Sequence, residues 1–377
     1  MLLAGFGFVP SVGCHMSTSL ENTQNHLKRP ENPFKKLKTA WQKMMQDLKT
    51  VKVLRLSFGM TISMAVAFAI NWPLAMLTPV FTVIILALPL PRPCFRQGFK
   101  NMMETLLGLT IGVLFALFLL PYPFVYILMF GLALFYTYYY INRGGSFWFA
   151  LMTLLSLLIM PMLATTSDGL AIGVSLGFVW SGWVAVWMIF LAHFFIPNPE
   201  FNITPTKPPM HKGYVPVAAE LALKSTLVVF PLATLFLVFN LTDFLVLMIM
   251  VSIFSLSPDL TKGKEAGMNS LISTLIGGIA AYCFYWLLVA VPEYPFFVVL
   301  TFFLSLIFAI VIFSGRSDAK YYSSALTTVI ILFSASMGED KDFTSTFFLR
   351  VALIIAAVLY LVVALKVLDR YWPSNKN

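Results

Sequence analysis

Residues 98–112 read GFKNMMETLLGLTIG, and residues 267–281 read GMNSLISTLIGGIAA. The first glycine, the Thr-Leu pair and the glycine that follows it recur in the second stretch at a constant spacing of 169 residues. The same spacing relates landmarks on either side, so the set comprises Asn71, Pro89, Gly98, Gly108 and Pro123 with their counterparts Asn240, Pro258, Gly267, Gly277 and Pro292. Matching turn and small residues at a fixed distance, in apolar sequence that has otherwise diverged, indicate one structural unit used twice.

The composition excludes a water-soluble fold. Of the 377 residues, 59% are hydrophobic and 11% are charged, and the mean hydropathy is +0.86. Soluble domains average roughly 25% charged residues. The apolar runs are about 17–24 residues long and uninterrupted, whereas barrel strands would show alternating runs of about ten residues. We therefore expect an all-α polytopic membrane protein.

The apolar runs predict about twelve transmembrane helices in two repeats of six. Their approximate limits are 54–70, 74–90, 103–120, 122–140, 146–163, 172–195, 222–239, 243–257, 268–290, 295–314, 321–337 and 346–366. Because six is an even number, both copies would enter the membrane from the same side and form parallel repeats.

The distribution of charge predicts the orientation. One set of alternate turns is acidic or neutral, and the other set carries the bases Arg92, Arg96, Lys100, Arg143, Lys207, Lys212, Lys262, Lys264, Arg316 and Lys320. This pattern follows the positive-inside rule and predicts that both termini are cytoplasmic. It also accounts for the net charge of +9 without a nucleic-acid surface.

The predicted organisation has four parts. Residues 1–53 form an N-terminal segment with a basic amphipathic helix over 32–53, which we expect to lie on the lipid surface. Residues 54–196 form the first membrane repeat, 197–221 a proline-rich cytoplasmic linker, and 222–377 the second repeat. Initiation at Met1 and initiation at Met16 are both compatible with the sequence.

No pattern predicts an enzyme, a cofactor or a metal site. The cysteines, Cys14, Cys94 and Cys283, are widely spaced, and the four histidines form no cluster with metal-ligand spacing. We also find no nucleophile–base pair and no phosphate-binding loop in the sequence.

The landmarks resemble those of the fusaric acid resistance or aromatic acid exporter family. The features concerned are Arg55 opening the first span, Pro89 ending a tight hairpin, a basic loop, and then Gly98 and Gly108. The second copy, with Lys224, Pro258, Gly267 and Gly277, is similar to that family too, and the resemblance covers about residues 53–372. Long family members carry a large cytoplasmic domain between the repeats, so this chain resembles a short branch that lacks it.

The resemblance implies a component of the bacterial inner membrane that exports small organic, especially aromatic, acids against inward proton flow. It further implies a periplasmic membrane fusion protein and an outer-membrane channel as partners. Two other hypotheses remain open at this stage: an organic-anion channel, and a membrane assembly component without transport of its own.

Charged residues inside apolar runs are the candidates for chemistry, because burying one in hydrocarbon costs on the order of 3 kcal/mol. Glu104 either accepts the coupled proton or forms an interfacial pair with Lys100, and the second interpretation is favoured. Arg350 either holds a substrate carboxylate with its planar guanidinium or extends outward to Glu339, Asp340 or Asp342.

Two further features bear on the pathway. Arg55 and Lys224 occupy equivalent positions, and their place at the inner ends of spans favours anchoring at the membrane interface. Trp183 and Trp187 share a helical face with Trp180 and could line a pathway for aromatic rings, although lipid-facing or core packing is favoured. The sequence therefore predicts Arg350, Trp183 and Trp187 as substrate contacts and Glu104 as the proton site.

Overall fold

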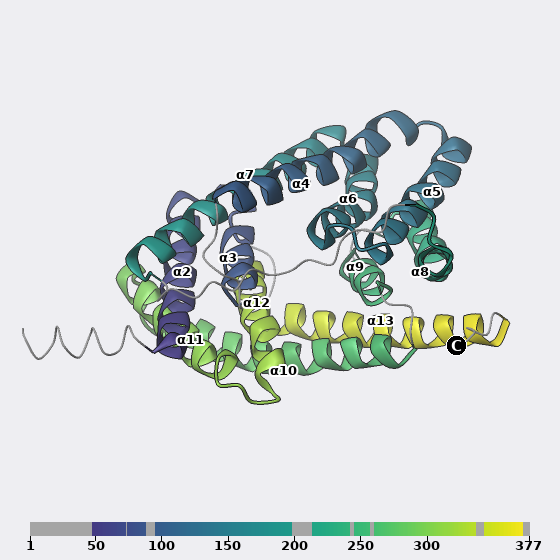
Figure 1. The fold of residues 1–377 in the computed structure, drawn as a ribbon. Coiled ribbons are helices and arrows are strands. Elements are labelled where there is room, and N and C mark those ends of the chain that lie inside the picture. The colour runs from purple at the N-terminus through teal and green to yellow at the C-terminus, as the bar shows by residue number, and fades with distance from the viewer. Residues whose placement is uncertain are drawn as a thin grey trace, which may run out of the picture. The chain divides into compact units, whose positions relative to one another are not determined.

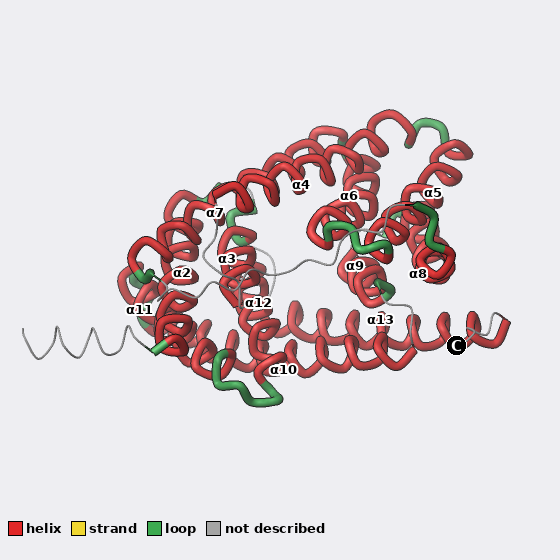
Figure 2. The backbone as a smooth tube through the Cα atoms, viewed as in Figure 1, coloured by secondary structure: helices red, strands yellow, loops and turns green. Residues whose placement is uncertain are grey.

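The computed structural model describes residues 47–72, 74–87, 95–197, 213–241, 245–256, 260–336 and 343–371. Leu48–Asn377 form one compact unit, and the fold below is that of its described residues. All elements among them are helices, and Figure 2 shows no strand there. Most of the predicted amphipathic helix over 32–53 lies outside the described residues, but its last residues, from Leu48, form the first turns of α2.

The first half of the unit contains six α-helices and one π-helical segment (Figure 1). They are α2 (Leu48–Ile70), α3 (Leu77–Ala87), α4 (Phe95–Leu114), η1 (Phe115–Leu119), α5 (Pro123–Asn142), α6 (Phe147–Thr166) and α7 (Asp168–Phe195). The second half contains six more: α8 (Pro216–Val238), α9 (Leu245–Phe254), α10 (Leu260–Ala290), α11 (Tyr294–Ile312), α12 (Ala319–Ser336) and α13 (Phe343–Tyr371).

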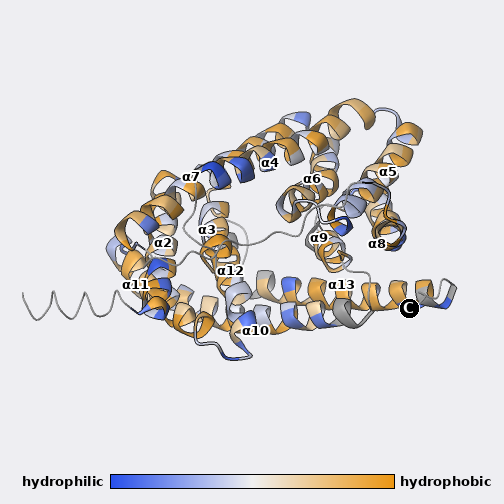
Figure 3. Cartoon of the chain, in the orientation of Figure 1, coloured by the Kyte–Doolittle hydropathy of each residue, from blue (hydrophilic) through white to orange (hydrophobic). Residues whose placement is uncertain are grey.

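Nine helices within the described ranges are long and apolar enough to cross a membrane, which identifies a polytopic membrane protein. They are α2, α4 with η1, α5, α6, α7, α8, α10, α11 and α13. As described, α3 and α9 have 11 and 10 residues, or about 16 and 15 Å at 1.5 Å per residue, against a hydrocarbon core of about 30 Å. Figure 3 shows that most helices are hydrophobic, with a hydrophilic stretch in the first turns of α4.

The helices pack as two four-helix bundles, and each bundle takes helices from both halves. The α2 bundle consists of α2, α3, α11 and α12, and each of these helices packs on two of the others. The α8 bundle consists of α5, α6, α8 and α9, which pack on one another in the same cyclic order. In Figure 1 the two sets lie at opposite ends of this unit. Each bundle thus joins the first and second helices of one half to the fourth and fifth helices of the other.

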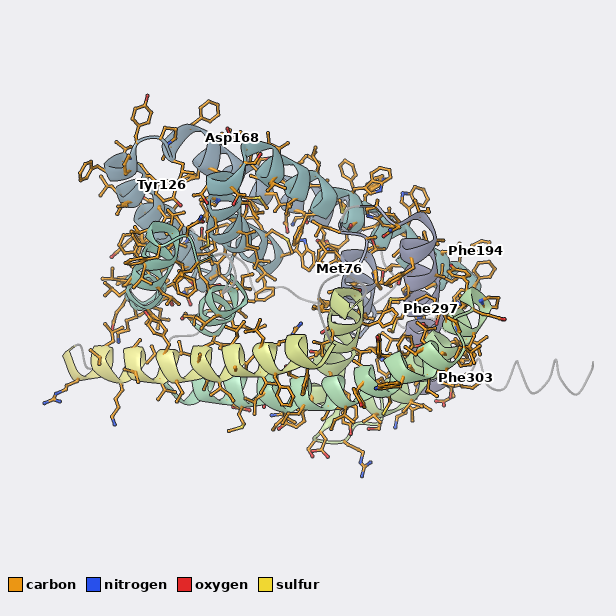
Figure 4. All side chains as sticks on the ribbon, turned by 180° about the vertical axis from the view of Figure 1, so that it is seen from behind. Met76, Tyr126, Asp168, Phe194, Phe297 and Phe303 are labelled. Atoms are coloured by element: carbon orange, nitrogen blue, oxygen red, sulfur yellow. The ribbon has the colours of Figure 1, made fainter. Side chains whose placement is uncertain are left out.

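The long helices connect the two bundles. α4 packs along α7, and α10 packs along α13, as Figure 1 shows. The core of the α2 bundle also contains Ile189 of α7 and Phe284 of α10, whereas the core of the α8 bundle contains Ala357 and Leu361 of α13. Figure 4 shows the side chains of this unit, including Phe297, which belongs to the α2-bundle core, and Tyr126, which belongs to the α8-bundle core.

The two asparagine landmarks end the first helix of each half in the same conformation. Asn71 has φ of 49° and Asn240 has φ of 50°, both in the left-handed region that non-glycine residues seldom adopt. Asparagine tolerates this region better than most residues because its short polar side chain can hydrogen-bond locally. The tight turn predicted after the first span is therefore present, while Pro89 and Pro258 lie outside the described residues.

The glycine landmarks lie where two helices approach closely. A Cβ at Gly108 of α4 would be 2.9 Å from the backbone nitrogen of Thr153 in α6, and one at Gly277 of α10 would be 2.5 Å from the carbonyl oxygen of Ala325 in α12. Gly98 and Gly267 similarly face Val186 of α7 and Val358 of α13. Small residues allow the backbones of membrane helices to approach, which explains glycine at these positions.

The fourth helices of the two halves bury matching positions. The buried residues of α5 and α11 pair at a constant spacing of 171: Tyr126 with Phe297, Phe130 with Thr301, Leu134 with Ser305, Thr137 with Phe308, and Tyr138 with Ala309. α11 contacts α2 of the other half through Tyr294, whose hydroxyl donates to the carbonyl oxygen of Ala65 at 2.8 Å. In the equivalent way α5 contacts α8 of the second half, where the ring centroids of Phe130 and Phe230 lie 6.2 Å apart.

Candidate functional site

Three basic side chains on the packed faces of the helices are separate candidates for a functional site. Arg55 of α2 is 5% exposed and Lys224 of α8 is 2% exposed. Arg350 of α13 has a buried guanidinium nitrogen, Nε, and lies on one face of the helix with Leu353 and Ile354, which belong to its buried stripe. A cation buried at membrane depth is costly, which makes it a functional candidate with a physical reason.

Lys224 is held by a carboxylate on its own helix. Its Nζ lies 3.1 Å from Oε1 of Glu220, one turn earlier in α8. The two side chains differ in environment: that of Lys224 is 3% exposed, and that of Glu220 is 38% exposed. The pair therefore reaches from the surface of the α8 bundle into its interior.

The C-terminal end of α9 lies beside this pair. Ser225, the neighbour of Lys224, donates its hydroxyl to the carbonyl oxygen of Ser255 at 2.6 Å, directly after the last residue of α9. The negative end of a helix dipole favours a nearby cation. The ammonium group of Lys224 is thus stabilised by Glu220, and the residue next to Lys224 contacts a helix end of the sign that favours a cation.

The first half has a cation at the position equivalent to Lys224 and a valine at the position equivalent to Glu220. Arg55 corresponds to Lys224, and the residue that corresponds to Glu220 is Val51, which is fully buried. One turn after Arg55, Gly59 faces Leu86 of α3 and Ala192 of α7, so this face of α2 is packed against protein. The interpretation of Arg55 and Lys224 as anchors at the lipid interface was wrong, because both lie on packed faces.

Arg350 occupies the core side of α13 near the start of the helix. Its Nε makes no hydrogen bond to any described residue. The acidic residues that the sequence offered as alternative partners, Glu339, Asp340 and Asp342, lie outside the described residues. Counting from the matching contacts of Val186 and Val358, the first-half counterpart of Arg350 is Phe178, whose ring packs against that of Phe81 at 6.0 Å.

The structure does not bring the predicted aromatic contacts to Arg350. Trp183 and Trp187 of α7 lie edge to face at 6.4 Å, and Trp187 is 52% exposed. α7 packs on α2, α3, α4 and α6, whereas α13 packs on α8, α9, α10 and α12. Trp180 and Phe194 of α7 are also exposed, and Figure 4 shows Phe194 at the periphery. The role of the two tryptophans as substrate contacts stays a prediction.

Glu104 of α4 takes part in a polar contact between helices. Its Oε1 lies 3.8 Å from Nζ of Lys100, and Ser146, the residue before α6, donates its hydroxyl to Oε2 at 2.6 Å. The favoured interpretation, a Lys100–Glu104 pair, is confirmed. The second-half counterpart, Ser273, donates to the carbonyl oxygen of Asn269 within its own helix. The use of Glu104 as a proton site stays a prediction.

The sequence analysis did not single out Glu220. A difference between the two halves could have indicated it, since an acid stands four residues before Lys224 and a valine stands four residues before Arg55. Over the residues that the structure covers, no group of three or more His, Cys, Asp or Glu side chains could hold a metal ion.

Comparison with known proteins finds that part of the chain matches the model of a family without an assigned function. The model of a family described as "Protein of unknown function (DUF2955)" matches residues 52–192, which include most of α2–α7. The chain matches no curated protein and no solved structure.

Proposed function

We propose that this protein is a secondary transporter that exports small organic, especially aromatic, anions across the bacterial inner membrane with coupled protons. The observation that carries the proposal is Arg350: a guanidinium on the buried face of an apolar helix, with its Nε free of hydrogen bonds among the described residues. The resemblance of the sequence to the aromatic acid exporter family supports the same substrate class.

A guanidinium with a buried Nε that lacks a described partner suits an organic anion for two reasons. Its donors form a rigid planar fork that matches a carboxylate with two parallel hydrogen bonds. An N–H donor without a partner in a low-dielectric interior costs about 1–3 kcal/mol, and an arriving anion removes that cost. Arg350 can therefore contribute to affinity without first breaking an ion pair among the described residues.

The architecture in this proposal is twelve spans in two parallel repeats, with both termini in the cytoplasm. Its support is the matched conformation of Asn71 and Asn240, the matched glycine contacts and the reciprocal composition of the two bundles. The shorter helices α3 and α9 would complete the count, since they occupy equivalent places in the two halves.

The test is export of a panel of aromatic acids from cells with and without the protein, over a range of external pH. The proposal predicts lower cell-associated acid in cells that express the protein. It also predicts that Arg350→Ala abolishes the difference while the amount of protein in the membrane fraction is unchanged. An equal content of every acid in both cell types would remove the exporter function.

A further inference from the structure

The ion pair of Lys224 and Glu220 differs in exposure from the other described ion pair with the same distance between nitrogen and oxygen. Lys320 and Glu265 also lie 3.1 Å apart, but their side chains are 49% and 61% exposed. Water solvates both of those charges whether or not they are paired. In the first pair only Glu220 reaches the surface, and the ammonium group of Lys224 is inside the protein.

This asymmetry constrains the charge that the site can hold. With Glu220 ionised and Lys224 protonated, the site is neutral. Removing the negative charge of Glu220 leaves a buried cation that needs another anion, because desolvation makes an isolated buried charge unfavourable. Adding an anion while Glu220 stays ionised instead gives the site an excess negative charge. Neutrality is kept only when one proton and one anion arrive together.

We propose that Lys224 is an anion site that opens when Glu220 takes up a proton, so that the coupled proton travels in the same direction as the anion. A proton from the aqueous side binds the half-exposed carboxylate of Glu220, and the ion pair to Lys224 is lost. The ammonium group keeps its own proton and binds the carboxylate or sulfonate of the substrate. Release of anion and proton restores the ion pair.

Among the described side chains of the helices that pack on α8, no other carboxylate could take this role. α5, α6 and α9 contain no Asp or Glu, and Glu220 is the one acid of α8. The helices packed on α8 also carry titratable or basic groups, among them Tyr138, Tyr139 and Arg143 at α5, and Tyr360, Lys366 and Arg370 on α13. Tyr138 and Tyr360 donate their hydroxyls to backbone carbonyls of Ser252 and Val228, so both phenols are already engaged. The side chain of Asp369 on α13 is outside the described part.

This inference rests on the proposed transport of organic anions. In it the proton moves in the same direction as the anion, whereas the family resemblance implies that protons move inward while the anion leaves. Proton binding and anion binding favour each other at a site of this kind, and the two events are linked in both directions. Acidification should therefore raise the affinity of the protein for the anion. Export would then be driven by the concentration gradient of the acid itself and would move no net charge.

The experiment uses the purified full-length protein in liposomes loaded with potassium benzenesulfonate and a pH-sensitive dye. Benzenesulfonate stays anionic and cannot carry a proton through lipid by itself. After dilution into medium without the probe, we expect the interior to become more alkaline as the anion leaves, with one proton released per anion. Because the process is electroneutral, valinomycin should leave the rate unchanged. Acidification of the interior, or anion release without a pH change, would overturn the proposal.

Three variants locate the residue that couples proton and anion movement. In Glu220→Gln the anion should leave without a proton, and valinomycin should now accelerate its release. Glu265→Gln, which removes the equally short but exposed pair, should behave like the unchanged protein. If Glu104→Gln loses proton release while Glu220→Gln keeps it, the proton site is Glu104 and the inference is wrong. If a variant fails to insert into the liposomes, the proton-to-anion ratio of the unchanged protein still tests whether the two ions leave together.

These outcomes separate the two proposals. Absence of benzenesulfonate release above that of protein-free liposomes removes the transport function itself. Release of the anion with the wrong direction of proton movement leaves transport standing and removes only the assignment of Glu220 and Lys224.

Discussion

The α2 bundle and the α8 bundle are built from equivalent helices, and they differ in the charges that those helices carry. Both contain a buried cation at the same place on the first helix of a half, Arg55 in one and Lys224 in the other. Next to the cation, the α2 bundle has Val51 and the α8 bundle has Glu220. The landmarks shared by the bundles are turns and close helix contacts, whereas the acid is present on one side alone. The shared features therefore explain the fold, and the differences indicate where ions bind.

The largest effect should come from separating the halves. Residues 1–205 or residues 206–377 expressed alone should yield no stable membrane protein, because each bundle needs helices from both halves. Co-expression of the two pieces should restore a complex with the stability of the intact chain. Size-exclusion chromatography of detergent extracts measures this. A stable, monomeric single half would show that the bundles do not need the exchange of helices.

Substitution of a glycine at a close helix contact should have the next largest effect. Gly277→Ala places a Cβ 2.5 Å from the carbonyl oxygen of Ala325, and such overpacking typically costs about 1–3 kcal/mol. Gly173→Ala is the matched control, because no atom lies within 4 Å of its added Cβ and alanine favours helix by up to about 1 kcal/mol. Thermal unfolding in detergent should lower the melting temperature of the first variant and keep or raise that of the second. Equal shifts would mean that α10 and α12 do not approach at Gly277.

Glu220→Gln should destabilise the protein more than Glu265→Gln does. The first change leaves the ammonium group of Lys224 buried without its carboxylate, at a cost of about 1–3 kcal/mol. The second removes an exposed pair whose contribution is at most about 1 kcal/mol. Chemical unfolding of both variants measures the difference. A larger loss for Glu265→Gln would contradict the burial of Lys224.

The smallest effects should come from the asparagine turns, and they should be the same in both bundles. Asn71→Ala and Asn240→Ala each force alanine into a left-handed conformation, at a cost of about 1–2 kcal/mol. Asn71→Gly and Asn240→Gly should retain stability, since glycine adopts this conformation readily. Melting temperatures of the four variants test the equivalence. A loss confined to one bundle would show that the two turns are not equivalent.

The sequence predicted the long helices well because an uninterrupted apolar run has few alternatives in a membrane. Landmarks such as Asn71 and Gly108 could also be interpreted, because a left-handed turn and a close helix contact each restrict which residue fits. The spacing of 169 residues thus identified positions with equivalent surroundings, although it said nothing about which half supplies the neighbouring helix.

The exchange of helices between bundles was not predictable from the sequence. In lipid, every apolar face is equally compatible with hydrocarbon, so the pattern does not choose among partners. The same limit led to the wrong assignment of Arg55 and Lys224 to the interface, because a cation near a helix end suits either environment. Glu220 was missed because it lies in the first turns of α8, just before the span predicted over 222–239, where an acid attracts no notice.

The most direct test of the proposed function is flux of radiolabelled benzenesulfonate from liposomes that contain the purified protein. We predict saturable release that Arg350→Ala reduces about tenfold to a hundredfold, since a hydrogen bond to a charged group contributes about 1.5–3 kcal/mol. Lys366→Ala, an exposed base on the same helix, should release the probe at the unchanged rate. Release by the Arg350→Ala protein that equals that of the unchanged protein would contradict the assignment of Arg350 as the anion contact.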